Sequence, residues 1–175
     1  MNHFYNDING WFTFPRFYKA MANRFESGAT LIEVGTYKGQ SFSYLIVEAI
    51  NAGKTFDFIA IDACPWPDVE PDFTKNMLPL KDHYRTLFGG DSFDRANDFE
   101  DGSIDFVFLD ANHSYEFISK DIAAWLPKIK EGGILAGHDY DPKDWPGVIQ
   151  AVKETFGEDF NKEYLDEVVW YKVIK

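Results

Sequence analysis

The sequence predicts an α/β fold, in which helices cover both faces of a doubly wound, mostly parallel sheet. Short apolar runs alternate with helical segments along the chain, which is typical of such sheets. Runs such as Thr30–Val34 and Ile104–Leu109 are almost continuously apolar, as expected of strands buried on both faces. The short polar motifs follow the ends of these runs, where parallel sheets bind their ligands.

Length and composition favour one packed domain spanning residues 1–175. A chain of 175 residues buries enough surface to fold without disulfides or metals, and 45% of its residues are hydrophobic and 18% aromatic. The only cysteine is Cys64, so no internal disulfide forms.

The charge argues against nucleic-acid and membrane partners. The formal net charge is -12 and the sequence pI about 4.6, so the surface repels phosphate backbones but still admits a cationic small ligand. No apolar run approaches the roughly 18–20 residues that span a bilayer, and the first residues lack the features of a signal peptide. We therefore expect a cytoplasmic protein.

Periodicity and breakers place the elements along the chain. Aromatic residues at helical spacing predict the first helix, and Pro15 suits its first turn. Helices are predicted at 11–26, 41–50, 92–99, 116–126 and 148–156. Strands are predicted at 30–34, 56–61, 84–88, 104–109, 133–136 and 168–174. Residues 63–80 hold four prolines and predict a long loop, with one short helix near 73–77, of the kind that covers a binding site.

A glycine-bounded turn follows the first strand. Gly35 allows a sharp turn and a close approach, and Gly39 lets the next helix begin against the strand. The spacing differs from that of dinucleotide binders, and Glu33 precedes the first glycine by two residues. Asp62 ends the next strand, 27 positions after Gly35, where a carboxylate can accept from both ribose hydroxyls. Together they predict a ligand with a ribose and a cationic tail.

Three segments resemble a known family. Residues 33–39 are similar to the first motif of class I S-adenosylmethionine-dependent methyltransferases. Residues 104–115 and 132–140 are similar to a small bacterial and phage branch, akin to macrolide sugar O-methyltransferases and cephalosporin-hydroxylase-like proteins. The resemblance covers about Trp11 to Phe156 and implies the Rossmann-like methyltransferase fold, with S-adenosylmethionine as cofactor.

The resemblance also implies cofactor contacts. Glu33, Gly35 and Gly39 would border the methionine part of the cofactor, Asp62 would hold the ribose, and Ser41 is a further candidate cofactor contact. The adenine would face Asp91 and Ser92, which also suit a helix N-cap, and Asp110 would border the cofactor.

A chemical edge is expected where two strands end. Asp110 follows one strand and His138-Asp139 follow the next, and the implied strand order makes these strands neighbours. Together with His113 they form a candidate catalytic set that can take a proton from a hydroxyl. Asp110, His138 and Asp139 are also candidate ligands of a divalent metal, although the imidazole is unusual for magnesium and leaves manganese, zinc or no metal open. His113 can equally be a structural imidazole, and Asp139 a cap for nearby amides.

We expect an O-methyltransferase acting on a small molecule or sugar. Two alternatives stay open. One is a metal-assisted hydroxylase-like or cofactor-cleaving enzyme on the same fold, and the other is a non-catalytic nucleoside-binding sensor. A homodimer through an exposed final strand is an expectation from the fold.

Overall fold

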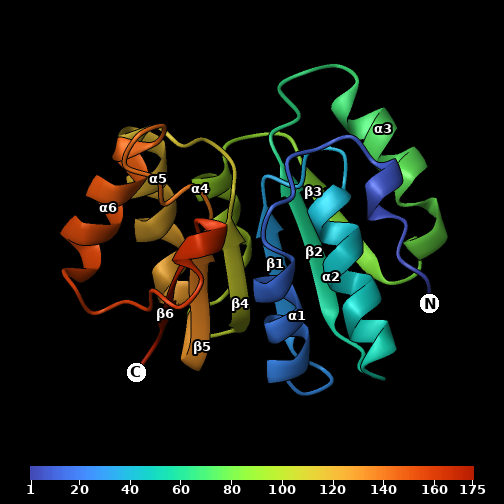
Figure 1. The fold of residues 1–175 in the computed structure, drawn as a ribbon, viewed down its shortest axis with the longest axis horizontal. Helices are drawn as coiled ribbons and strands as arrows, with labels where there is room; N and C mark the ends of the chain where they lie inside the picture. Colours follow the sequence, from blue (N-terminus) through green and yellow to red (C-terminus); the bar gives the residue numbers. More distant parts are fainter.

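The computed structural model describes residues 1–175 and contains a six-stranded sheet with the strand order β3-β2-β1-β4-β5-β6. The first five strands are parallel, and β6 runs antiparallel to β5 at one edge (Figure 1). The strands are β1 (Thr30–Val34), β2 (Asp57–Asp62), β3 (Tyr84–Phe88), β4 (Ile104–Leu109), β5 (Ile129–Gly137) and β6 (Trp170–Val173). The predicted fold class is confirmed.

Side chains alternate between two buried faces of the sheet, as a two-residue strand period requires. On β1, Leu31 joins a core cluster with α1 (Pro15–Arg24), α2 (Gln40–Asn51) and α3 (Val69–Asn76). Its neighbour Ile32 joins the cluster on the other face with two further helices, and a third, short helix packs against one of them. Those helices are α4 (Ser92–Arg95), α5 (Tyr115–Trp125) and α6 (Pro146–Phe156). Helices therefore cover both faces, as expected.

The strand ends lie in one row, and this row positions the site. Val34 is in register with both Ile61 and Leu109, and Leu109 is in register with Gly137. The residues that follow these ends therefore emerge at the same edge of the sheet. β1 and β4 lie side by side at the point where the strand order reverses, which is where open α/β sheets bind ligands.

The first helix begins later than the sequence predicts. Residues 11–14 are not helical, and α1 starts at Pro15. The first amides of α1, from Arg16 and Phe17, donate to the carboxylate of the buried Glu167, each at 3.0 Å. The preceding segment instead runs across the binding edge of the sheet, where the amide of Phe12 donates to Gln40.

Other predicted boundaries need smaller corrections. The helix predicted at 92–99 is the short α4 followed by a 3-10 turn, Ala96–Asp98. The strand predicted at 133–136 begins four residues earlier, and its pairing with β4 shifts register between Ile104 and Phe106. The loop at 63–80 holds a full helix, α3, which also begins four residues earlier than expected. No helix has the length and apolar character needed to cross a membrane.

Candidate active site

A cavity of about 740 Å³ opens at the carboxyl edge of the parallel strands. Of the eight predicted cofactor residues, five line it: Gly35, Asp62, Asp91, Ser92 and Asp110. Its volume lies within the range of small-molecule and cofactor sites. The other three, Glu33, Gly39 and Ser41, lie outside the lining.

Glu33 is buried behind the glycine turn. Tyr18 Oη and Ser41 Oγ donate to its two carboxylate oxygens, each at 2.6 Å. Burial raises the pKa of Glu33 to about 8, although both hydrogen bonds oppose the shift. Glu33 and Ser41 thus support the turn from within the core.

The two glycines of the turn serve packing. Gly35 has φ +89°, and a Cβ there would lie 2.2 Å from the carbonyl oxygen of Asp110. Gly39 is the N-cap of α2 with φ +90°, and a Cβ there would lie 2.9 Å from the Met77 side chain. The backbone that lies close to Gly35 is therefore that of the turn after β4, at Asp110.

Asp62 ends β2 and orders the two loops that follow β1 and β2. Its oxygens accept from the amides of Tyr37 and Cys64, each at 2.7 Å. Burial raises the pKa of Asp62, and these two amide hydrogen bonds partly offset the shift. Each carboxylate oxygen has a second lone pair, so the group can still accept from a ligand in the cavity.

Asp91 and Ser92 border the cavity after β3. Asp91 is the N-cap residue of α4, but its side chain makes no capping hydrogen bond. Ser92 Oγ donates to the buried carboxyl of Asp121, whose pKa is raised to about 6 because burial outweighs that hydrogen bond. Ser92 is thereby fixed in place by α5.

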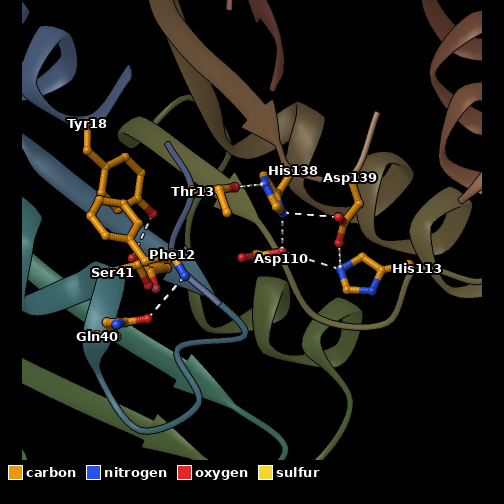
Figure 2. Close-up of polar contacts among 10 residues, drawn as sticks. Phe12, Thr13, Tyr18, Gln40, Ser41, Asp110, His113, His138 and Asp139 are labelled. Atoms are coloured by element: carbon orange, nitrogen blue, oxygen red, sulfur yellow. Dashed lines mark hydrogen bonds and ion pairs between the residues drawn. The ribbon is translucent and has the colours of Figure 1, made fainter. Parts of the chain in front are cut away.

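The four predicted catalytic residues form one cluster, shown in Figure 2. His113 Nε2 lies 2.8 Å from Asp139 Oδ2 and 3.3 Å from Asp110 Oδ1. His138 Nδ1 lies 3.2 Å from Asp139 Oδ1 and 3.5 Å from Asp110 Oδ1. The contacts of both imidazoles with Asp110 are made to its Oδ1.

The cluster stabilises charged imidazoles. Burial lowers the pKa of His113 and of His138, but the hydrogen bonds and charges of Asp110 and Asp139 outweigh it and raise both values to about 9. Burial disfavours the charged form of Asp139, yet the two imidazoles hold its pKa well below the usual range. Asp139 has φ +58°, a left-handed conformation that aspartate tolerates better than most residues.

The two imidazoles differ in their access to the cavity. His113 lines the cavity, and its ring packs 4.7 Å from the ring of Trp145. His138 is buried outside the lining, and its Nε2 lies 2.9 Å from Thr13 Oγ1. Donor atoms of Asp110, His113 and Asp139 lie within 4.8 Å of one another and could hold a metal ion. The sequence predicts His138 as the third ligand, whereas this group contains His113.

Several contributors were not identified from the sequence. Thr13 hydrogen-bonds across 125 positions to His138, and Tyr18 reaches Glu33 from α1. The lining also includes Tyr37, and Asp144 and Trp145 enter it from the start of α6. No local sequence pattern signals these contacts.

Lys38 secures α3 beside the cavity. Its ammonium pairs with Asp68 at 2.6 Å and with Asp72 at 2.7 Å, and the charges of both aspartates raise the pKa of the lysine. Asn76 Nδ2 donates to the Lys38 carbonyl at 3.0 Å. The segment expected as a covering loop therefore holds an anchored helix, α3, whose residues are not among those that line the cavity.

Comparison with known proteins identifies the family. The family model described as "Methyltransferase domain" matches residues 32–140, more than half of the chain, so the chain belongs to this methyltransferase family. The match includes the glycine turn and the chemical edge, and it confirms the resemblance on which the predicted methyltransferase class depends.

Two curated relatives are similar over most of the chain. Protein R132 of Acanthamoeba polyphaga mimivirus is 28% identical over 142 residues, covering 77% of this chain and 62% of that protein. Protein y4gI of Sinorhizobium fredii is 21% identical over 150 residues, covering 81% of this chain but 16% of that protein. The chain thus spans less than two thirds of the length of either relative.

Solved structures share the fold. CalS11, described as a TDP-rhamnose 3′-O-methyltransferase, has a TM-score of 0.64 at 14% identity, covering 90% of this chain and 75% of that chain. The O-methyltransferase NovP has a TM-score of 0.64 at 16% identity, with 93% and 80% covered. Aeropyrum pernix fibrillarin with bound S-adenosylmethionine has a TM-score of 0.59 at 13% identity, with 90% and 74% covered.

Proposed function

We propose that the chain is a cytoplasmic S-adenosylmethionine-dependent O-methyltransferase of a small molecule, acting as one domain. The observation that carries the proposal is the cavity at the reversal of strand order, lined by the motif residues of a methyltransferase family. Bound S-adenosylmethionine in fibrillarin and the O-methyltransferase activity named for CalS11 and NovP support it. The net charge of -12 argues against a nucleic-acid acceptor.

The cavity residues fit the cofactor. Asp62 keeps free lone pairs for the ribose hydroxyls, and Asp91 has no capping bond that would compete for the adenine amino group. Gly35 and Asp110 border the position of the methionine part, with Glu33 and Ser41 holding the turn from behind. When bound, S-adenosylmethionine supplies an electrophilic methyl group on a sulfonium, which an acceptor oxygen attacks as the carbon–sulfur bond breaks.

Asp110 is positioned to receive the acceptor's proton. Both imidazoles are directed at Oδ1 of Asp110, so Oδ2 can accept from a hydroxyl in the cavity. The proton passes to this oxygen as the new O–CH₃ bond forms. His113 also faces the cavity and is the second catalytic residue, whereas His138 and Asp139 are positioning residues outside the lining.

Three members of the cluster also suit a divalent cation. Two carboxylates, from Asp110 and Asp139, and the imidazole of His113 form a mixed oxygen and nitrogen donor set, which suits manganese or zinc better than magnesium. A bound ion would lower the pKa of an acceptor hydroxyl. Titration of chelator-treated protein with manganese chloride tests this part: one binding site that Asp139→Asn weakens at least tenfold supports it, and no binding refutes it.

Turnover and cofactor binding measured together test the enzyme assignment. S-adenosylhomocysteine formation is followed with a panel of glycosides and phenols. We expect Asp110→Asn to lower turnover about 100-fold or more while binding of the cofactor changes by less than tenfold. Asp101→Asn, on an exposed carboxylate that pairs with Lys128, is the matched control and should leave both unchanged. Cofactor binding without turnover across the panel would favour the nucleoside-binding sensor instead.

A further inference from the structure

We propose that the acceptor carries no phosphate or carboxylate group, and that it is a neutral or cationic hydroxyl compound with a flat face that stacks on tryptophan. This inference rests on the proposed function and adds the substrate class. It is drawn from the charges that line the cavity, the engagement of nearby lysines, and the aromatic rings at the mouth.

The lining is acidic. Four aspartates line the cavity, Asp62, Asp91, Asp110 and Asp144, together with one histidine and no lysine or arginine. Phosphates and carboxylates are usually recognised by arginine or lysine, because charge-assisted hydrogen bonds offset the cost of removing an anion from water. With Asp62 and Asp91 facing the cofactor, an anionic acceptor would meet Asp110 and Asp144, and the imidazole of His113 is already paired with Asp110 and Asp139.

Lysines on the bordering elements are engaged by acidic groups or lie outside the cavity lining. Lys38 follows the lining residue Tyr37, but its ammonium is held by Asp68, the N-cap residue of α3, and by Asp72. Lys120 on α5 pairs with Glu116 at 2.8 Å. Lys143 precedes Asp144 on an exposed loop and is not among the lining residues. None of these side chains lines the cavity.

Exposed aromatic rings flank the mouth. Trp66 is 56% exposed and Trp145 is 41% exposed, and both line the cavity. Tyr37 packs against Trp66 at 6.1 Å and against Trp11 at 5.2 Å between ring centroids. Exposed indole faces bind flat apolar surfaces and cations well. Acidic walls with aromatic faces therefore select a neutral or cationic partner.

The proposed cofactor is compatible with the same charges. S-adenosylmethionine carries a sulfonium and an ammonium against one carboxylate, so it is a net cation at neutral pH. The acidic lining thus favours this cofactor and disfavours anionic acceptors such as nucleotide sugars.

Ionic quenching of tryptophan fluorescence tests the local charge without an identified acceptor. The signal of Trp145 is isolated by comparison with Trp145→Phe, and that of Trp66 with Trp66→Phe. Quenching by caesium, iodide and neutral acrylamide is scaled to a free tryptophan derivative. We expect the scaled ratio of caesium quenching to iodide quenching to be at least about three at both rings. A ratio of one or less would overturn the inference.

Charge variants separate the cavity from the whole protein. Asp144→Lys should lower the ratio at Trp145 at least twofold. Glu131→Lys changes the net charge equally at an exposed position near the opposite end of β5, and should leave the ratio unchanged at about 0.15 M salt, because fields are screened over about 8 Å. Equal effects of the two variants would show that the preference is not local and would overturn the inference.

Matched acceptors test the substrate class directly. Methyl glucoside, glucosamine and glucuronate share a ring and differ in charge, as do 4-methylphenol, tyramine and 4-hydroxybenzoate. In any series that is methylated, we expect the anion to be at least tenfold slower than its partners, and a faster anion would overturn the inference. Where no series is methylated, the quenching ratio decides. Absent cofactor binding would remove the proposed function while leaving the quenching ratio as measured.

Discussion

Replacing Glu33 by glutamine should remove a pH dependence of stability that the buried carboxyl imposes. The pKa of Glu33 is raised from 4.5 to about 8 in the folded protein, mainly by burial. The folded state therefore holds a proton that the unfolded state releases, so this contribution to stability is complete below about pH 4.5 and is lost as the pH rises through about 8. Glutamine resembles the protonated carboxyl and does not titrate.

The magnitude follows from the two pKa values. At pH 6.5 the protonated carboxyl contributes about 2 kcal/mol to the free energy of unfolding, since each pH unit below 8 is worth about 1.4 kcal/mol, and at pH 9.5 it contributes almost nothing. The wild type should thus lose about 2 kcal/mol relative to Glu33→Gln over this interval, because all other titrations are shared.

Urea unfolding followed by circular dichroism at several pH values measures this difference. Glu131→Gln, at an exposed position, is the matched control and should follow the wild type at every pH. Parallel stability profiles of wild type and Glu33→Gln would refute the argument, because they would mean that Glu33 is ionised in the core.

Three further predictions concern the glycine turn, helix α3 and the N-terminal segment. Gly35→Ala should lower the free energy of unfolding in urea by more than about 3 kcal/mol, or prevent folding, because the added Cβ would meet the Asp110 carbonyl. Gly53 also has positive φ but has open space around it, so Gly53→Ala should lower the free energy of unfolding by about 1 kcal/mol. Lys38→Met should cost only about 1 kcal/mol, because its aspartate partners are half exposed, but should increase hydrogen exchange of α3 amides specifically; unchanged exchange would contradict the anchoring role. Thr13→Val should cost about 1–2 kcal/mol in urea unfolding because it leaves buried His138 Nε2 unpaired, and an unchanged stability would contradict that contact.

The sheet could be predicted from the sequence because its signal is local. β3 and β4 have the bounds that the apolar runs predict, and the ends of β2 and β4 place Asp62 and Asp110 where expected. The parallel register then brings the residues after adjacent strands together without further information. Most of the cofactor edge follows from these two facts.

Other features depended on contacts between distant parts of the chain. Aromatic spacing around Trp11 imitates a helix, but Thr13 is held in an extended segment by a histidine 125 positions away. α3 was hidden by the prolines in and around it, although Pro71 lies in its first turn, where the missing amide hydrogen costs nothing. Glu33 was expected at the cofactor because strand periodicity alone does not show that α1 supplies a hydrogen-bond donor behind the strand.

Thermal unfolding with and without ligand tests the central claim, that the cavity binds S-adenosylmethionine. A ligand at about 100 times its dissociation constant adds about 2.7 kcal/mol, which for a domain of this size raises Tm by roughly 5–10 °C. We expect this shift with S-adenosylmethionine and with S-adenosylhomocysteine, and none with NAD at the same concentration. No shift with either adenosyl compound at saturating concentration would contradict the account.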